Sequence, residues 1–352
     1  MPQNFTSLLL SWNKKSNKRE MPWKGEKDPY KVWLSEVILQ QTRVEQGLPY
    51  YEKFIKTFPG IQHLANAKDE DVFKLWEGLG YYSRCRNLLH TARIIANEFD
   101  GKFPNDYKDI LMLKGVGPYT AAAIASFCFN QQHAVVDGNV IRVLARVYGI
   151  KKSVTSADGK KYFEKIAQEN LDKKSPGIYN QSIMDFGATF CKPQSPLCSA
   201  CVMNNICIAF KKNKIDAYPV KEKAIVKKER WFNYFIFKAG DKIFIRQRTE
   251  KDIWQGLHEY FLHESGREIK WSEKTIVSFL KKETSIYKPI SVSFSKAKPQ
   301  QLTHQLISGY FIEVKLNSIP SFLKNQYGQW VSADKLSAKA FPKFINSHPL
   351  QG

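Results

Sequence analysis

Four cysteines near the middle of the chain are the residues whose types and spacing best suit chemistry. Cys191, Cys198, Cys201 and Cys207 lie within seventeen residues in the spacing C-x6-C-x2-C-x5-C. Four thiolates brought together in this way suit a [4Fe–4S] cluster or a structural zinc ion. The uneven spacing favours iron, because zinc sites more often show two C-x2-C pairs. Disulfides are disfavoured because no segment of the chain signals export.

A second pattern, over residues 111–121, places Gly115 and Gly117 between two apolar runs. Glycines two residues apart allow a sharp backbone turn that leaves amide N–H groups exposed. A helix starting at Thr120 would add the positive end of its dipole, which favours a bound phosphate. The pattern predicts a helix–hairpin–helix that holds a nucleic-acid backbone without reading its sequence. The alternative is an ordinary turn between two helices.

Two polar residues, Asp137 and Asn139, lie shortly after this pattern and just before an apolar helical run. By itself Asp137 would be interpreted as a helix N-cap. Its place after a predicted phosphate-binding hairpin also makes it a candidate for chemistry on the bound strand.

The composition favours nucleic acid as the partner. The chain has 352 residues and a formal charge of +21, from 54 Lys and Arg against 33 Asp and Glu, and both halves are basic. Counterion release drives such chains onto nucleic acid. An acidic membrane surface is the alternative, but no basic amphipathic helix stands out. The N-terminus lacks a signal peptide, and no stretch approaches the roughly 18 apolar residues of a membrane helix. We expect a soluble, cytoplasmic protein with reduced thiols.

Hydrophobic periodicity predicts a mainly α-helical part followed by a small α+β part. Helical spacing marks residues 32–46, 69–79, 84–99, 119–129, 140–148, 158–170 and 178–190. Asp69 and Asp158 are the predicted N-caps. After a lysine-rich linker at 211–230, the alternating runs at 231–237 and 242–246 predict a hairpin around Gly240 and Asp241. Further strands are expected at 291–294 and 310–314, and a helix at 271–282. The expected domains are 1–210 and 231–352.

The chain resembles the helix–hairpin–helix DNA glycosylases with an iron–sulfur cluster, and within them the adenine DNA glycosylases. The resemblance covers nearly the whole chain. Its motifs occur in the family's order: Pro22-Trp23, residues 29–42, residues 78–88, the glycine hairpin, Asp137-Gly138-Asn139 and the four cysteines. It implies a helix–hairpin–helix domain with a [4Fe–4S] loop and a C-terminal Nudix-like α+β domain.

The resemblance implies base excision repair, with cleavage of the N-glycosidic bond of adenine mispaired with 8-oxoguanine or guanine in double-stranded DNA. Glu36 would be the general acid at a ring nitrogen, and its apolar helix neighbours suit a proton held near neutral pH. Asp137, kept ionised, would stabilise the oxocarbenium-like sugar or attack it. Asn139 belongs to the same catalytic set. The alternative for Glu36 is an ion pair with Arg43.

The family's base pocket and DNA contacts carry over by position. Trp23 and Leu39 would flank the flipped adenine, and Gln181 would read its edge. Gln41 and Tyr81 would fill the duplex opposite the oxidised guanine. Core packing is the alternative for both Trp23 and Tyr81. The remaining expected DNA-binding residues are Gln40, Thr42, Arg86, Gly115 and Gly117.

Tyr119 separates two enzyme types of this superfamily. Endonuclease III-like glycosylase-lyases place a lysine nucleophile at this position, so the tyrosine implies a monofunctional glycosylase. We expect its hydroxyl to bond Asp137. Two other interpretations remain open: an endonuclease III-like lyase, and a non-catalytic iron–sulfur DNA binder. A monomer is the expected state.

The C-terminal part resembles Nudix-like domains at residues 254–261, but it lacks the acidic box that holds catalytic metal. It would therefore read 8-oxoguanine rather than hydrolyse a substrate. The reader loop, commonly Phe-Ser-His, is Leu302, Thr303 and His304 here. Thr303 keeps the hydroxyl, whereas Leu302 loses the aromatic ring. Lys114 replaces a common proline before the hairpin.

Overall fold

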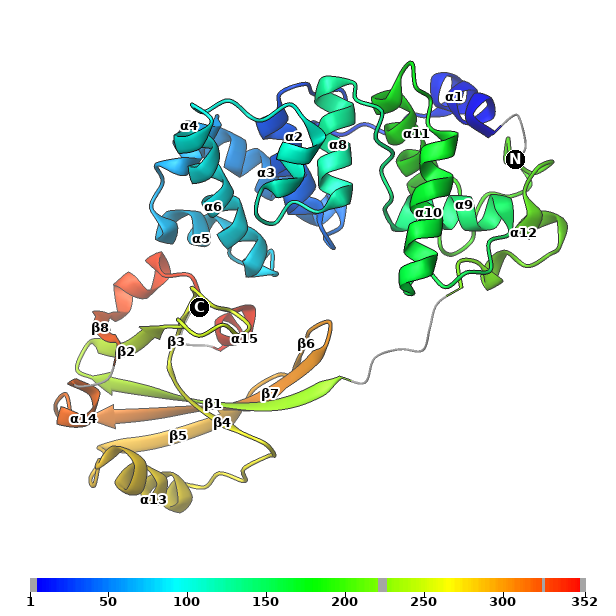
Figure 1. Ribbon diagram of the computed structural model, residues 1–352. Helices are drawn as coiled ribbons and strands as arrows, with labels where there is room; N and C mark the ends of the chain where they lie inside the picture. Colours follow the sequence, from blue (N-terminus) through cyan, green and yellow to red (C-terminus); the bar gives the residue numbers. More distant parts are fainter. Residues whose placement is uncertain (1–4, 221–226, 325–326, 349–352) are drawn as a thin grey trace. The chain divides into compact units, whose positions relative to one another are not determined.

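The computed structural model describes residues 5–220, 227–324 and 327–348 (Figure 1). The chain divides into two compact units, Met1–Asn66 with Asn87–Lys223, and Ala67–Arg86 with Ala224–Gly352. A short helical segment thus groups with the C-terminal residues, whereas the sequence predicts one domain over 1–210. Of the expected linker at 211–230, residues 221–226 lie outside the described part.

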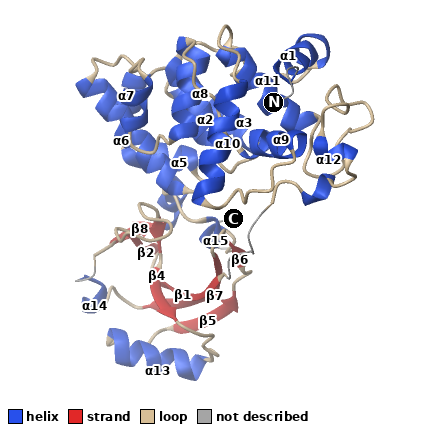
Figure 2. Ribbon diagram, turned by 45° about the vertical axis from the view of Figure 1, so that its right-hand side comes forward, coloured by secondary structure: helices blue, strands red, loops and turns tan. Residues whose placement is uncertain are grey.

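The first unit is helical (Figure 2). Its elements are α1 (Phe5–Ser16), α2 (Pro29–Leu39), α3 (Val44–Thr57), α4 (Ile61–Ala65), most of α6 (Tyr82–Glu98), α7 (Tyr107–Met112), α8 (Pro118–Phe129), α9 (Gly138–Tyr148), α10 (Ala157–Asn170), α11 (Pro176–Thr189), α12 (Ile208–Lys211) and the 3-10 turn η1 (Ile215–Ala217).

Helix α2 is buried almost all round. Its N-cap Asp28 accepts a hydrogen bond from the Tyr30 amide at 2.9 Å, and Pro29 occupies the first turn, where its missing N–H is not needed. Ser35 and Glu36 are buried along with the apolar residues of this helix. A helix with no polar face belongs inside the molecule, so its one carboxyl is held away from water.

Helices α8, α9 and α11 form the centre of the first unit. Helix α8 buries seven consecutive residues, mostly alanines, which allows close helix packing. Helix α11 approaches α9 so closely that a Cβ at Gly187 would lie 2.7 Å from the Cβ of Asn139. Side chains from α1, including Phe5, Leu9 and Trp12, complete this core. The core therefore fixes the start of α9, where Asp137 lies.

Six of the seven helices predicted within residues 1–210 were confirmed, and one was wrong at its centre. The predicted helix 32–46 is two helices, because Gln41 adopts a left-handed φ of 56° between α2 and α3. Both predicted N-caps were also wrong, since Lys68 and Ser156 hold those positions. Each aspartate lies inside the first helical turn instead, where its charge still favours the helix dipole.

The second unit contains a mixed sheet. Its elements are α5 (Asp69–Trp76), the first turn of α6, β1 (Lys228–Ala239), β2 (Lys242–Gln247), β3 (His258–Glu259), β4 (Phe261–Ser265), α13 (Glu273–Thr284), β5 (Ser291–Lys296), β6 (Gln300–Gln301), β7 (Gln305–Leu316), α14 (Ser321–Lys324), β8 (Gln329–Ser332), the 3-10 turn η2 (Ala333–Ala338) and α15 (Lys343–Asn346).

The strand order is β3-β2-β1-β7-β5, with β1 and β7 parallel over twelve residue pairs. The predicted hairpin is confirmed, since Lys238 pairs with Ile243 and Ala239 with Lys242 across the turn. Helix α13 covers one face of the sheet (Figure 2), packing Ile276 and Leu280 with the strand phenylalanines. No helix in the described ranges has the length and apolarity that crossing a membrane requires.

Candidate active site

A cavity of about 180 Å³ in the first unit brings several predicted site residues together. Glu36 of α2, Trp23 of the preceding loop and Gln181 of α11 all line it. Trp23 is 8% exposed and packs edge-on against Tyr51, with 5.1 Å between the two ring centroids. It is therefore both a core residue and part of the cavity wall. Leu39 is not among the lining residues. The cavity is large enough for a nucleobase and offers it an aromatic wall, an amide and a carboxyl group.

The carboxyl group of Glu36 has an unusual proton affinity. It is 6% exposed, and desolvation by burial raises its pKa to about 7. A hydrogen bond from the Tyr119 hydroxyl opposes this shift, and the nearby charge of Asp137 adds to it. No ion pair joins Glu36 to Arg43 in the described structure. Glu36 can therefore hold a proton near neutral pH and deliver it to a base in the cavity.

Asp137 is the N-cap of α9, as one interpretation of the sequence held. Its Oδ1 accepts a hydrogen bond from the Val140 amide, and its Oδ2 accepts one from Asn139 Nδ2, both at 2.7 Å. Burial raises the pKa of Asp137, while these hydrogen bonds and the charge of Arg142 lower it. The N-cap role and a role in chemistry are compatible, because the cap fixes the direction in which the carboxylate points.

Tyr119 differs from the expectation in its contact. Its hydroxyl donates to Met184 Sδ at 3.9 Å and also interacts with the carboxyl of Glu36, whose pKa it lowers. In the described structure Asp137 takes its side-chain hydrogen bonds from Asn139 and Val140, and none from Tyr119. The tyrosine therefore acts on the acid of the site rather than on the aspartate.

The glycine hairpin has the predicted form with one correction. Helix α8 begins at Pro118 rather than Thr120, with Gly117 as its N-cap. Gly115 has a φ of +81°, and a Cβ there would lie 2.6 Å from the Cβ of Asn87. The Thr91 hydroxyl donates to the Lys114 carbonyl at 2.8 Å and so fixes the turn against α6. The first turn of a helix leaves its N–H groups without partners inside that helix, so the start of α8 suits an anion.

The residues next to the break between α2 and α3 are partly exposed. Gln40 Nε2 donates to Thr120 Oγ1 at 3.4 Å, which links this break to the start of α8. Thr42 Oγ1 donates to the Gln40 carbonyl at 3.4 Å. Gln41 is exposed and holds its left-handed backbone. Backbone strain at a non-glycine residue is typical of functional sites.

In the second unit Tyr81 shows the same feature, with a φ of 48° and a side chain 43% exposed, so it is not a core residue. The Arg84 guanidinium lies 5.3 Å from the Tyr81 ring centroid and from that of Trp76. The Tyr81 hydroxyl and Thr303 Oγ1 are 2.6 Å apart. Two residues far apart in sequence, each expected to contact the damaged pair, therefore meet directly.

This contact lies on a second cavity, of about 670 Å³. Leu302, Thr303 and His304 line it together with Tyr81 and Arg86. The Arg86 guanidinium donates to the Gln255 carbonyl at 2.5 Å, which joins the start of α6 to the segment before β3. The three predicted reader residues, 302–304, thus line the same cavity as Tyr81 and Arg86, the two predicted DNA-binding residues from 78–88.

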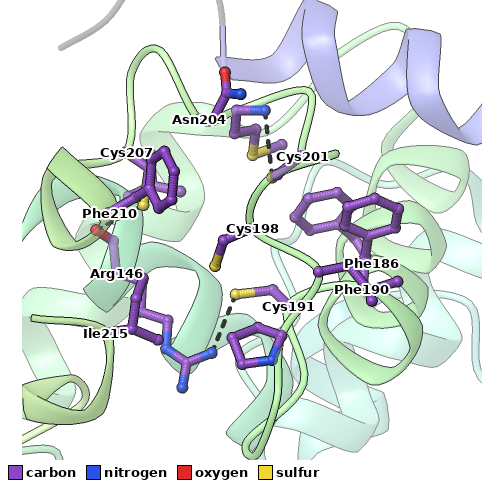
Figure 3. Close-up of a pocket in the computed structure, with 14 residues that line it drawn as sticks. Arg146, Phe186, Phe190, Cys191, Cys198, Cys201, Asn204, Cys207, Phe210 and Ile215 are labelled. Atoms are coloured by element: carbon purple, nitrogen blue, oxygen red, sulfur yellow. Dashed lines mark hydrogen bonds between the residues drawn. The ribbon is translucent and has the colours of Figure 1, made fainter. Parts of the chain in front are cut away.

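The four cysteines also line one cavity, shown in Figure 3. The other lining residues are apolar apart from Arg146 and Asn204, and none is a carboxylate or an imidazole. Arg146 Nη1 lies 3.5 Å from Cys191 Sγ and donates to the Lys192 carbonyl at 2.7 Å. No three histidine, cysteine, aspartate or glutamate side chains of the described chain converge on a position for a single metal ion.

Two buried arginines of α9 were missed by the sequence analysis. Arg142 donates to the Asn139 side chain at 2.8 Å and to the Cys191 carbonyl at 2.9 Å, so it links the candidate site to the cysteine loop. Arg146, one turn further, donates to carbonyls of that loop. Their spacing in the sequence could have revealed them. Two basic residues four positions apart within an apolar helical run face the core and need buried acceptors.

A helix–hairpin–helix beside a buried acid in a base-sized cavity defines a base-excision DNA glycosylase. The family model described as HhH-GPD superfamily base excision DNA repair protein matches residues 34–173. The chain is 37% identical over 285 residues to the adenine DNA glycosylase of Buchnera aphidicola subsp. Schizaphis graminum, covering 80% of this chain and 82% of that protein. The chain belongs to the adenine DNA glycosylase (MutY) family and is a DNA-repair hydrolase.

Another relative and two solved structures are also similar to this chain. The adenine DNA glycosylase of Mus musculus is 43% identical over 217 residues, covering 59% of this chain and 42% of that protein. A solved thermostable thymine-DNA glycosylase is 28% identical with a TM-score of 0.55, covering 59% of this chain and 95% of that chain. An endonuclease III–DNA complex, 21% identical with a TM-score of 0.52 and covering 60% and 97%, shows the shared fold.

Proposed function

We propose that this adenine DNA glycosylase removes adenine from pairs with 8-oxoguanine or guanine in double-stranded DNA, without lyase activity. The observation that carries the proposal is Glu36, a carboxyl group with a pKa near 7 on the wall of a base-sized cavity. Adenine leaves readily only when its five-membered ring is protonated. A buried acid that holds its proton at neutral pH supplies that proton.

Asp137 has the complementary role. Its carboxylate lies close enough to raise the pKa of Glu36, and the hydrogen bonds of Asn139 and Val140 hold it in one direction. An anion fixed in this way stabilises the positive charge that develops on the sugar as adenine departs. Tyr119 offers no amine for a Schiff base with that sugar, which supports a monofunctional reaction.

The cysteine cavity supports a [4Fe–4S] cluster held by Cys191, Cys198, Cys201 and Cys207. A donor set of four thiols with no carboxylate or imidazole among the lining residues fits iron–sulfur ligation. When bound, the cluster supplies a rigid, charged centre that orders the loop. Arg146 and Arg142 then connect that loop to α9 and so to Asn139.

The second unit is proposed to be a Nudix-like reader of 8-oxoguanine. Thr303 offers a hydroxyl to the oxidised base, and Tyr81 enters the duplex beside it. Their mutual hydrogen bond places both at one cavity. Thr303→Val should therefore narrow the rate difference between adenine opposite 8-oxoguanine and adenine opposite guanine, while Ser291→Val, on the distant strand β5, should leave it unchanged.

The central test is single-turnover adenine release from a duplex with adenine opposite 8-oxoguanine, with a matched adenine–thymine duplex as control. Release from the mispair alone is expected. Glu36→Gln, which keeps the shape but cannot give up a proton, should lower the rate by about 10² to 10⁴-fold while duplex affinity persists. Equal release from both duplexes, or full activity in Glu36→Gln, would refute the proposal.

A further inference from the structure

Asp185 is a buried acid that the proposed mechanism does not use. It lies on α11 with a side chain that is 0% exposed. Its Oδ1 accepts hydrogen bonds from Arg19 Nη1 at 3.0 Å and from Gln181 Nε2 at 2.9 Å. Its Oδ2 accepts one from Asn17 Nδ2 at 2.9 Å and lies 3.0 Å from Lys24 Nζ. Four donors from two segments, residues 17–24 and α11, thus surround one carboxylate.

The contact with Gln181 has a chemical consequence. A glutamine amide can present either its oxygen or its NH₂ group to a partner, and only the surroundings decide between them. A carboxylate between two cations accepts hydrogen bonds and donates none. Asp185 therefore takes the NH₂ group of Gln181, one helical turn away on the same face of α11. The oxygen, Oε1, receives no hydrogen bond from the described residues and is left for the cavity that Gln181 lines.

We propose that Asp185 is a positioning residue that fixes the Gln181 amide with its oxygen toward the base and so selects a purine carrying an amino group. Adenine offers an N–H donor at its six-position, whereas hypoxanthine and guanine offer an oxygen there. If the Gln181 oxygen faces the six-position oxygen of hypoxanthine or guanine, two acceptors meet. Both then remain without a hydrogen bond in a buried site. The inference rests on the proposed function of the same cavity and adds the origin of its base selectivity.

A purely structural role makes a different prediction. Asp185 also joins the segment around Asn17 and Lys24 to α11, and loss of that connection would lower the rate on every base alike. Loss of the amide orientation instead changes the ratio of rates between bases. The ratio of adenine release to hypoxanthine release, both opposite 8-oxoguanine, is therefore the informative readout.

The test uses the full chain and the variant Asp185→Asn. An asparagine both donates and accepts, so Gln181 becomes free to turn its NH₂ group to the cavity. The adenine-to-hypoxanthine ratio should fall by about 10-fold or more relative to the unmodified protein. Gln181→Leu should lower the ratio as well. The double variant should show the ratio of Gln181→Leu alone, because both changes remove one interaction.

Asn17→Ala is the matched control, because it removes another donor to Asp185 and leaves the bond to Gln181 in place. Its ratio should stay unchanged even if its overall rate falls. If Asp185→Asn does not fold, Asp185→Ser takes its place, since a hydroxyl also both donates and accepts.

An unchanged ratio in Gln181→Leu or in the folded Asp185 variant, or an equal shift in Asn17→Ala, would overturn the proposal. Failure of the unmodified protein to release adenine would instead refute the proposed function, so the two failures can be told apart.

Discussion

The burial of Glu36 affects both the acidity of its carboxyl group and the stability of the fold. It is a carboxyl group among the buried residues of α2, and it has no cation beside it in the described structure. Burial without a neighbouring cation is unfavourable for the charged form, so the group keeps its proton to a higher pH. The burial that suits Glu36 to the proposed role of acid therefore also makes it a weak point in the fold.

The pH dependence of the rate should reflect both carboxyl groups. In the proposed mechanism Glu36 acts in its protonated form, so adenine release should fall as the pH rises through about 7. The same mechanism needs Asp137 ionised, and burial raises the pKa of Asp137, so the rate should also fall toward acid pH. A single-turnover pH profile checks this bell shape, and a rate that stays constant from pH 6 to pH 9 would contradict it.

Glu36→Gln should stabilise the protein at alkaline pH. The pKa of the folded state, about 7, exceeds the ordinary value of 4.5, so the folded state holds a proton that the unfolded state has lost between these values. The free energy of unfolding of the unmodified protein therefore falls as pH rises through this window, by about 3 kcal/mol in total. Denaturant unfolding at pH 8 should show the variant to be more stable, with little difference at pH 4.5. A variant less stable at both pH values would contradict this account.

At the scale of elements, the sequence predicted helices well where apolar spacing is regular and a turn residue ends the run. It failed at residues 40–43, because the apolar pattern continues through a break that the left-handed backbone of Gln41 creates. No glycine or proline marks that break. The N-caps at Asp69 and Asp158 failed because a capping aspartate and a first-turn aspartate look alike in sequence.

The hairpin between α7 and α8 allows a matched pair of substitutions. Gly115→Ala forces a positive φ on a residue with a Cβ and brings that atom 2.6 Å from Asn87, so it should cost about 1–3 kcal/mol and weaken duplex binding. Gly117→Ala has open space and a φ of −96°, so its cost should stay below about 1 kcal/mol. Thermal unfolding and duplex affinity of both variants check this. Equal losses would show that the turn geometry is not what matters.

Arg142 is the link between α9 and the cysteine loop. Its guanidinium donates to Asn139, to the Gly187 carbonyl and to the Cys191 carbonyl at 2.8 to 2.9 Å. Arg142→Lys keeps the charge but cannot reach three acceptors, so both iron content and adenine release should fall. Iron per chain and single-turnover rate measure the two effects. Arg93→Lys, outside this network, is the control, and full iron and full rate in Arg142→Lys would contradict the link.

Contacts between distant segments of the chain explain why some residues of the candidate site could not be predicted from the sequence. The cysteines became candidates through their spacing, Asp137 through its place after the glycine hairpin, and Glu36 through the resemblance that residues 29–42 bear to a family motif. Asp185 is held by Asn17 and Arg19, which lie 168 and 166 residues away in the sequence. Nothing in the local spacing of α11 distinguishes that aspartate from a solvent-exposed one. Residues whose role depends on contacts between distant segments appear only once the chain is folded.

The charge of the whole chain leads to the last prediction. With a net charge of +21 and about six phosphate contacts, the logarithm of duplex affinity should fall with a slope near −5 against the logarithm of salt concentration. Contacts to phosphate carry no sequence information, so a matched adenine–thymine duplex should give the same slope with a weaker affinity at every salt concentration. Titrations of Glu36→Gln, in which adenine release is expected to be slow, measure both lines. A steeper slope for the mispair would mean that recognising it recruits further phosphate contacts, and a flat slope would contradict binding through the basic surface.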